Sequence, residues 1–432
     1  VETSLGMTVK SKSVILTNGT FLNGLMHVGQ KNFGGGRAGE RNSTGITAQL
    51  KQFGFVDGRM KTGTPPRVDA RSLDFTKMEE QKGDEFPSKF SFSDTKPLKE
   101  QRSCHITYTN PAVHDILASG LDRSPMFSGT IKGTGPRYCP SIEDKIVRFA
   151  ERDRHQIFVE PEGWDTVEIY VNGFSTSLPM DVQFAAIKQI SGFEKVKLFR
   201  PGYAIEYDYF PPTQLKHTLE TKLIDNLYFA GQINGTTGYE EAGGQGLMAG
   251  INASLKVQSK QPLILGRDQA YIGVLIDDLI TKGTDEPYRM FTSRAEYRIL
   301  LRQDNADTRL TRLSHEIGLA SSERLAALDH KEKTTEDILT HLNKTSIDPK
   351  DVNEFLKASG TSEIKQKVKL STIISRPQVT LDSVIKGLPK QEKTLSTYPQ
   401  ACIEQAEIKI KYSGYIESCL LYTSPSPRDQ AK

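Results

Sequence analysis

With 432 residues, the chain is long enough for two or three domains, each with its own hydrophobic core. Hydrophobic residues make up 36% and charged residues 25%, a balance typical of globular proteins. No run of about 18 apolar residues occurs, which excludes a membrane-spanning helix. The formal net charge of +3 is close to neutral for this length, so a nucleic-acid partner would need a local basic surface.

The four cysteines are scattered and form no Cys-x-x-Cys pair: they are Cys104, Cys139, Cys402 and Cys419. This spacing argues against a disulfide scaffold or a structural zinc site and suits a reducing compartment. None of the eight histidines forms a His-x-His or His-x-x-x-His pairing with carboxylates, so we expect no metal site. The sequence also lacks a P-loop and a Ser-His-Asp pattern.

The beginning of the chain resembles part of a nucleotide-binding α/β sheet. A strand is predicted over residues 9–18, and Gly19-Thr20 ends it with a small-residue turn. Residues 33–39 formally match Gly-x-Gly-x-x-Gly, but no apolar strand leads into them. We therefore expect a flexible loop beside a cofactor, with a contact from Ser43. The main dinucleotide fingerprint is absent from this sequence.

Cys139 is the strongest candidate for a nucleophile. Proline is favoured at the first helical position, so Pro140 predicts that Cys139 is the N-cap of a short helix that reaches about residue 150. Unpaired amides and the positive helix end would stabilise a thiolate there, and Arg137 and Lys145 would add to this effect. The alternative is an ordinary cysteine at a helix start.

A second informative segment spans residues 230–250. The buried strand Leu227–Ala230 enters it, several glycines form a tight loop, and a helix is predicted near Gly246–Leu255. The amino-terminal end of such a helix favours an anion, such as a phosphate or the N1–O2 edge of a reduced flavin. The alternative is a glycine-rich segment that serves helix packing.

The remaining segments differ in character. Residues 76–104 are polar and predict a mobile loop, whereas residues 156–171 alternate and contain β-branched residues, which predicts strands. Beyond about residue 264, long charged amphipathic stretches with few glycines predict a helical domain.

Three arginines in the helical part are four residues apart and are predicted to share one helical face: Arg294, Arg298 and Arg302. Tyr288 and Phe291 precede them. Proteins that bind single-stranded RNA typically contact its phosphates with arginine guanidinium groups and stack its bases on aromatic rings. Internal ion pairing with neighbouring acidic residues is an equal alternative; the candidates are Glu296, Asp304 and Asp307.

Several long motifs resemble the MnmG family, also called glucose-inhibited division protein A. The two most specific are residues 135–145 and 230–253. Shorter blocks agree with the same family: Lys61–Arg67, Ser175–Pro179, Arg200–Asp208 and Lys411–Ile416. The resemblance runs from about residue 1 to about residue 417 and favours the nucleophile interpretation of Cys139.

The resemblance implies an α/β fold with three parts. They are a Rossmann-like FAD-binding domain that lacks its N-terminal part, an inserted α/β domain, and a C-terminal all-helical domain. We expect residues 1–64 and 222–263 in the FAD-binding domain, 65–221 in the inserted NAD and substrate domain, and 264–417 in the helical domain. About 140 residues with the FAD pyrophosphate fingerprint and a second cysteine are expected to be missing from the start. Residues 418–432 do not read as a continued helix and look non-native.

The resemblance also implies an activity. The family binds FAD, reduces it with NADH and, with the GTPase MnmE, adds a carboxymethylaminomethyl-type group to C5 of the wobble uridine of certain tRNAs. Methylene-tetrahydrofolate provides the one-carbon unit through the partner. The family is typically a homodimer, and a heterotetramer with MnmE in the bacterial cytoplasm is expected; the mitochondrial matrix is the alternative compartment.

Site residues follow from the matching positions. Cys139 matches the family's essential cysteine, and its thiolate is expected to add to uracil C6 so that C5 becomes nucleophilic. Gln232 and Ser43 match flavin-contacting positions, and Gly235 and Gly238 belong to the same loop. The segment assigned to NAD contributes six expected contacts: Gly135, Pro136, Arg137, Tyr138, Ser141 and Lys145. The helical domain is expected to meet MnmE and to support tRNA through Arg294, Arg298 and Arg302.

Two other functions stay open. One is that of a smaller relative, the folate- and FAD-dependent tRNA uridine-5 methyltransferase, which lacks the helical domain. The other is an inactive fragment that binds tRNA or the partner, since the nucleotide fingerprint is missing.

Overall fold

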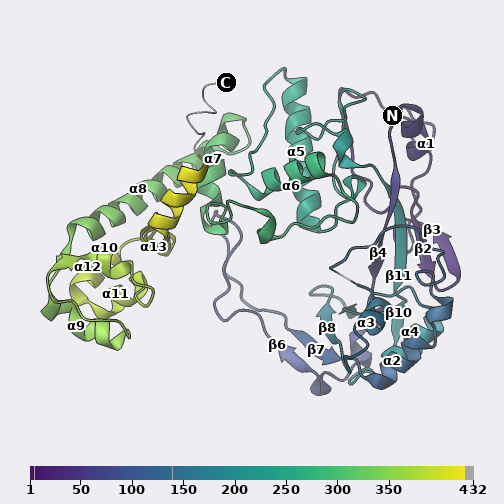
Figure 1. Cartoon of the computed structure of the whole chain (residues 1–432), viewed down its shortest axis with the longest axis horizontal. Coiled ribbons are helices and arrows are strands. Elements are labelled where there is room, and N and C mark those ends of the chain that lie inside the picture. The colour runs from purple at the N-terminus through teal and green to yellow at the C-terminus, as the bar shows by residue number, and fades with distance from the viewer. Residues whose placement is uncertain (4, 139, 424–432) are drawn as a thin grey trace. The chain divides into compact units, whose positions relative to one another are not determined.

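The computed structural model describes residues 1–3, 5–138 and 140–423. The chain forms two compact units. The first comprises Val1–Phe90, Thr95–Leu265 and Ile272–Phe291, and the second comprises Ser91–Asp94, Gly266–Tyr271 and the chain from Thr292 onward. Figure 1 shows the helices and strands of both units.

A parallel strand pair lies in the half of the first unit that the sequence predicts to be Rossmann-like. β1 (Val14–Leu16) pairs with β12 (Leu227–Phe229), and α5 (Tyr239–Val257) packs on both strands. α1 (Ile46–Gln52) and α6 (Tyr271–Lys282) are the other helices of this half. Ligands of open α/β sheets bind beyond the carboxyl ends of parallel strands, so the loops that follow β1 and β12 mark the expected site.

The first unit also contains a four-stranded antiparallel sheet in the order β3-β2-β11-β4. Its strands are β2 (Leu25–Val28), β3 (Lys31–Gly34), β4 (Gly58–Thr64) and β11 (Tyr203–Tyr209). The central strand β11 is buried from Ala204 to Asp208. This stretch includes two carboxylates, and buried carboxylates need hydrogen-bonding partners.

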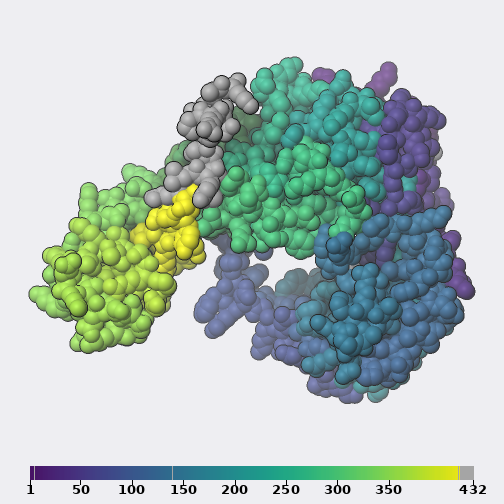
Figure 2. Space-filling model, viewed as in Figure 1, coloured from purple at the N-terminus to yellow at the C-terminus, as the bar shows by residue number. Residues whose placement is uncertain are grey.

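A six-stranded antiparallel sheet in the order β10-β5-β9-β8-β7-β6 forms the inserted part of the first unit. Its strands are β5 (Arg67–Asp69), β6 (Glu79–Gln81), β7 (Cys104–Tyr108), β8 (Gln156–Pro161), β9 (Glu168–Asn172) and β10 (Leu198–Arg200). α2 (Pro111–Ala118), α3 (Ile142–Arg148) and α4 (Met180–Ile187) cover one of its faces. Figure 2 shows the residues of this part as a closely packed blue surface.

The core beneath these helices explains why they dock. Alternate residues of β8 and β9 point toward the helices, and one apolar face of each helix meets them; Ile157, Val159, Ile169, Val171, Val113, Ile142 and Ala186 are all buried. Asn110 caps α2 by accepting the amide hydrogen of Val113 at 3.0 Å, and Pro111 occupies its first turn.

The second unit is helical. Its helices are α7 (Ala306–Glu316), α8 (Ser322–Lys344), α9 (Pro349–Ala358), α10 (Leu370–Ile374), α11 (Leu381–Gly387), α12 (Pro389–Leu395) and α13 (Gln400–Thr423). Two short strands, β13 (Ser346–Ile347) and β14 (Val368–Lys369), flank α9 and its following loop in the chain and pair antiparallel. α13 packs along α8, and apolar residues of α8 to α13 form one core.

The α/β class and the helical C-terminal part expected from the sequence are confirmed. Three local predictions were wrong in their bounds. α5 begins at Tyr239 and includes Gly243, Gly244 and Gly246, because tertiary packing stabilises a glycine-rich helix that propensity disfavours. The predicted loop 76–104 is exposed and without helix or strand over residues 82–102, but its ends contain β6 and the first residue of β7.

The third correction concerns the C-terminal segment. α13 continues to Thr423 instead of ending near residue 417, and residues 424–432 lie outside the described part of the chain. The expected domain boundaries stay predictions. The compact units place Ile272–Phe291, which includes nearly all of α6, with the first unit instead of the helical one.

Candidate active site

The glycine loop (residues 231–238) connects β12 to α5 and contains three glycines with positive φ: Gly231 at 89°, Gly235 at 73° and Gly238 at 108°. These conformations are open mainly to glycine. A Cβ atom on Gly235 would also lie 2.6 Å from Thr284 Oγ1 and 2.9 Å from Met60 Cε. Glycine is therefore required at residue 235 by both backbone conformation and packing.

Gln245 holds the glycine loop from inside α5. Its fully buried Oε1 accepts the Gly231 amide at 3.1 Å and the Asn234 side-chain amide at 2.8 Å, while its Nε2 donates to Thr236 Oγ1 at 2.9 Å. Three hydrogen bonds from one side chain give the loop a single shape. Gln245 was not among the residues predicted from the sequence, although a polar residue in the second turn of a helix that follows a glycine loop was a usable signal.

The other expected flavin contacts lie near the glycine loop. The Gln232 side chain packs beside Gly19, which follows β1: a Cβ on Gly19 would lie 3.5 Å from Gln232 Oε1. Ser43 pairs through its backbone with Phe21 and Asn23 at 2.8 Å. The structure thus gathers Gln232 and Ser43 around the segment after β1, at the carboxyl end of the parallel strands.

The Gly34–Ala38 loop is anchored to the same segment. Thr20 Oγ1 donates to the Gly36 carbonyl at 2.6 Å, and the Ala38 amide donates to Tyr203 Oη at 3.3 Å. A Cβ on Gly36 would lie 2.2 Å from the ring of Phe21, so this glycine admits an aromatic ring against the backbone. These contacts replace the flexible loop that the sequence predicted.

A cavity of about 780 Å³ opens beside these segments. Its walls are the residues after β1, the Gly34–Ala38 loop, the end of β4, and the exposed faces of β8 and β9. Arg67 is held in its wall by Thr64 Oγ1 at 3.0 Å, by Glu162, and by the ring of Tyr170 at 4.2 Å. The volume and the mixture of aromatic and charged walls suit a heteroaromatic ligand.

The cysteine loop (residues 132–138) lies against β4. Thr134 forms a parallel bridge with Met60, and the Lys61 amide donates to the Thr134 carbonyl at 2.9 Å. A Cβ on Gly133 would lie 2.8 Å from the Met60 carbonyl carbon, and one on Gly135 would lie 2.7 Å from Lys61 Cε. These glycines therefore allow close packing of the loop on β4, and the expected ligand contact of Gly135 stays a prediction.

The predicted N-cap was wrong. α3 begins at Ile142, and Ser141 is its N-cap, with Ser141 Oγ accepting the Asp144 amide at 3.2 Å. Serine caps a helix better than cysteine because its hydroxyl accepts a strong hydrogen bond from a helix amide, so Pro140 precedes the cap. Cys139 itself lies outside the described residues.

The first turn of α3 is firmly held. Lys145 Nζ donates to the Gly173 carbonyl at 3.0 Å. Glu143 is fully buried, and its Oε1 accepts the Ser177 amide at 2.8 Å and the Ser177 hydroxyl at 2.9 Å. The start of α3 is thereby joined to the segment Ser175–Pro179, one of the blocks singled out in the sequence.

A bridging segment (residues 286–291) binds both loops. On one side, the Tyr288 amide donates to the Gly235 carbonyl and the Thr237 amide donates to the Tyr288 carbonyl, each at 2.8 Å. On the other side, Tyr138 Oη donates to the Pro287 carbonyl at 2.8 Å, and Arg137 Nε lies 3.1 Å from a carboxylate oxygen of Glu286. The glycine loop and the cysteine loop, about a hundred residues apart in sequence, thus share one support.

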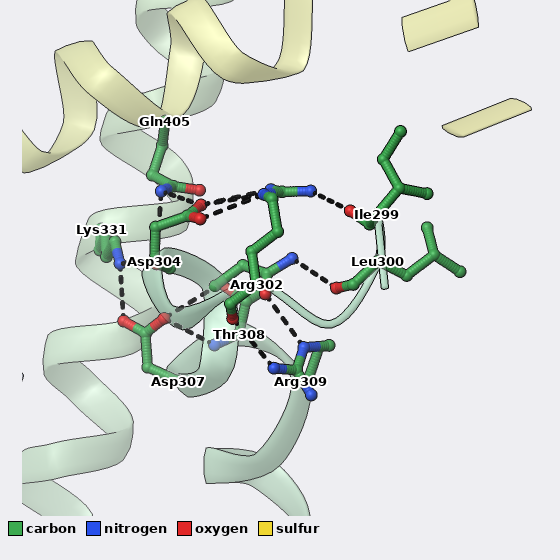
Figure 3. Close-up of polar contacts among 10 residues, drawn as sticks. Ile299, Leu300, Arg302, Asp304, Asp307, Thr308, Arg309, Lys331 and Gln405 are labelled. Atoms are coloured by element: carbon green, nitrogen blue, oxygen red, sulfur yellow. Dashed lines mark hydrogen bonds and ion pairs between the residues drawn. The ribbon is translucent and has the colours of Figure 1, made fainter. Parts of the chain in front are cut away.

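The three arginines do not share a helical face. The described backbone from Thr292 to Asn305 contains two short 3₁₀ helices and turns but no α-helix. Arg302 is engaged internally: its Nε donates to Asp304 at 3.1 Å and its Nη1 to the Ile299 carbonyl at 2.8 Å (Figure 3). Arg298 is exposed, and none of the described residues binds its guanidinium.

The acidic neighbours have different partners. Glu296 pairs with Arg267 at 2.6 Å, and Asp307 accepts Lys331 Nζ at 2.7 Å. Burial alone raises the pKa of Asp304, but hydrogen bonds from Gln405 and Arg302 outweigh burial and hold this pKa below its usual range. Tyr288 is buried, and its hydroxyl donates to Asp278 at 2.8 Å, so its ring is unavailable for stacking on a base.

No helix among the described residues is long and apolar enough to cross a bilayer. Likewise, within residues 1–3, 5–138 and 140–423, no three His, Cys, Asp or Glu side chains converge as metal ligands.

Comparisons with known proteins agree on one family. Residues 1–261 match the sequence model of glucose inhibited division protein A, and residues 322–418 match the model of the tRNA modifying enzyme MnmG/GidA C-terminal helical domain. A Flavobacterium psychrophilum protein named tRNA uridine 5-carboxymethylaminomethyl modification enzyme MnmG is 65% identical over 424 residues, which are 96% of this chain and 67% of that protein. A protein of the same name from Cytophaga hutchinsonii is 62% identical over 418 residues, with the same coverage.

A solved structure agrees as well. Aquifex aeolicus GidA, in its form II crystal, superimposes with a TM-score of 0.84 at 45% identity, covering 96% of this chain and 65% of that one. The chain spans about two thirds of the length of the relatives it matches. The chain belongs to the glucose inhibited division protein A (MnmG/GidA) family.

Proposed function

We propose that the complete protein is a FAD- and NADH-dependent enzyme subunit that modifies C5 of the wobble uridine of tRNA. With the GTPase MnmE as partner, it adds a carboxymethylaminomethyl-type group whose one-carbon unit comes from methylene-tetrahydrofolate. The names of the relatives support this activity. The observation that carries it is the bridging segment, which hydrogen-bonds to both the glycine loop and the cysteine loop.

The residues present suit an isoalloxazine ring. α5 is 19 residues long, and no described side chain caps its amino-terminal end, so its free amides favour an electron-rich ring edge. The buried Oδ1 atoms of Asn18 and Asn234 have no partner among the described residues and would accept hydrogen bonds from a ligand. FAD would supply hydride chemistry there, with Ser43, Gln232, Gly235 and Gly238 holding the ring.

Cys139 is the proposed nucleophile. Its thiolate adds to C6 of the uracil, which makes C5 nucleophilic toward the one-carbon unit. The glycine contacts to β4 and the Tyr138 contact to the bridging segment hold the residues that precede this cysteine in the chain. Base addition of this kind requires a fixed geometry between thiolate and ring.

The NADH contacts belong to the same proposal. Of the six residues expected from the family, Arg137 and Tyr138 are exposed and would bind a dinucleotide beside their contacts to Glu286 and Pro287, while Gly135, Pro136, Ser141 and Lys145 shape the loop and the start of α3. Arginine binds phosphate and tyrosine stacks on planar rings, so these two side chains suit a dinucleotide.

The helical unit is proposed to contact tRNA and MnmE. Arg298 is the arginine best placed for a phosphate, because it is exposed and unpaired among the described residues. Arg294 is retained as a second contact, and Arg302 contributes by shaping the segment. A homodimer, a heterotetramer with MnmE, and a place in the bacterial cytoplasm complete the proposal.

The test of the nucleophile compares two cysteines in the full-length protein. Cys139→Ser should retain flavin and its reduction by NADH but lose uridine modification. Cys104→Ser is the control, because burial and the nearby Glu160 raise the pKa of the Cys104 thiol and keep it unreactive. Wild-type turnover in Cys139→Ser would contradict the proposed chemistry.

The fragment alternative has its own test. If the 432-residue chain retains flavin, its purified form should absorb at about 450 nm with about one flavin per chain. A colourless preparation would support a binding fragment. The match of residues 322–418 to the MnmG/GidA helical domain argues against the methyltransferase relative, which lacks that domain.

A further inference from the structure

We propose that Glu206 is a positioning residue that holds the cysteine loop on β4 and thereby sets the reactivity of Cys139, an inference that rests on the proposed role of this cysteine. Glu206 lies on the central strand β11 and is 4% exposed. Its Oε1 accepts the amides of Lys132 and Gly133, each at 2.9 Å. Two main-chain hydrogen bonds to one carboxylate oxygen fix the position at which the loop begins.

The contact on β4 extends this anchor. Register places Glu206 opposite Lys61, and the Lys61 amide donates to the Thr134 carbonyl at 2.9 Å. Three consecutive residues of the loop are therefore held through backbone atoms, from two neighbouring strands. Since Cys139 follows Thr134 by five residues, a shift of this anchor moves the backbone that leads to the thiol.

The second carboxylate oxygen has a dedicated partner. Glu206 Oε2 lies 3.0 Å from His27 Nε2, and His27 on β2 is 1% exposed. Burial by itself raises the pKa of Glu206, but hydrogen bonds from His27, Gly133 and Lys132 outweigh it and lower the pKa to about 2. The carboxylate is thus ionised while it binds the loop, and charge-assisted hydrogen bonds of this kind are the strong ones.

The sheet offers a matched comparison two residues along the same strand. Asp208 is equally buried, and its carboxylate accepts Arg59 Nη1 at 2.6 Å and Asn23 Nδ2 at 2.5 Å. None of its described contacts reaches the cysteine loop. Loss of a carboxylate at residue 208 therefore perturbs the strand without touching the loop.

The experiment measures the rate at which iodoacetamide alkylates Cys139 in the full-length protein, by peptide mass spectrometry over a range of pH. Glu206→Ala should change this rate at least about tenfold and shift its pH profile. Glu206→Gln keeps an acceptor for both amides and should stay within about threefold of wild type. Asp208→Ala should leave the pH profile unchanged even if the melting temperature falls.

Gly133→Ala provides a second variant that keeps the buried carboxylate. Its Cβ would lie 2.8 Å from the Met60 carbonyl carbon, so the loop must leave β4 and the alkylation profile should change as in Glu206→Ala. Wild-type profiles in both variants, or an equal change in Asp208→Ala, would overturn the assignment of Glu206. The readout needs no turnover, so failure of the proposed uridine chemistry would be seen separately with Cys139→Ser.

Discussion

Arg298 is the residue whose replacement separates RNA contact from internal ion pairing. Its side chain is exposed, and no described residue binds its guanidinium. Arg302, by contrast, donates to Asp304 and to the Ile299 carbonyl (Figure 3). Replacing Arg298 with alanine should therefore remove one phosphate contact, whereas replacing Arg302 should remove none directly.

The size of the effect follows from counterion release. Loss of one contact to a single strand lowers the slope of log K against log salt concentration by about 0.7, which corresponds to about fourfold weaker binding near 0.15 M salt. Arg302→Ala should leave that slope unchanged. It should instead lower the melting temperature, because Asp304 loses a charged partner and the turn before α7 loses its cross-link.

The assay is fluorescence anisotropy of labelled substrate tRNA with the full-length protein, at salt concentrations from about 0.05 to 0.3 M. A salt slope for Arg298→Ala identical to that of wild type would refute the phosphate contact. An equal decrease in Arg302→Ala would refute the distinction between the two arginines.

The buried carboxylates and the glycines support three further expectations. The folded-state pKa of Glu206 lies near 2, below its ordinary 4.5. The contribution of its carboxylate to the stability of the folded protein is therefore full above pH 4.5 and is lost as the pH falls toward 2. Glu206→Gln should flatten this acid part of a titration followed by circular dichroism. Glu143→Ala should destabilise the protein by about 3 kcal/mol in urea unfolding, because the Ser177 amide and hydroxyl lose their acceptor; a midpoint equal to wild type would contradict this. Gly235→Ala should lower flavin retention and melting temperature, because its Cβ would meet Thr284 and Met60. Gly243→Ala has open space on α5 and should raise the free energy of unfolding by about 0.5 kcal/mol or more. Equal effects of the two variants would refute the packing argument.

The sequence predicted the elements that depend on local pattern. The strand before the glycine loop, the strands at 156–171 and the helical C-terminal part were all visible as periodicity. Long motifs were sufficient to indicate the family, which the comparisons confirm. The predicted start of α3 was wrong, because Pro140 indicated an N-cap at residue 139. The N-cap is Ser141, whose hydroxyl is the better acceptor for a helix amide.

Spacing was also a poor guide to the arginines. Residues four apart share a face only if the backbone is helical, and the segment from Thr292 to Asn305 forms 3₁₀ turns. The short turns leave Arg302 directed at Asp304 and leave Arg298 exposed. Periodicity alone carried no information on which arginine had an internal partner.

The sequence by itself determined the family, the fold class and the residue types available for chemistry, because these depend on composition, periodicity and contiguous motifs. Tertiary structure alone decided which groups meet. Glu206 binds amides 73 and 74 residues away, and Tyr138 reaches a carbonyl 149 residues away. Such hydrogen bonds exist only after distant strands have come together, since each needs donor and acceptor within about 3 Å in a suitable orientation.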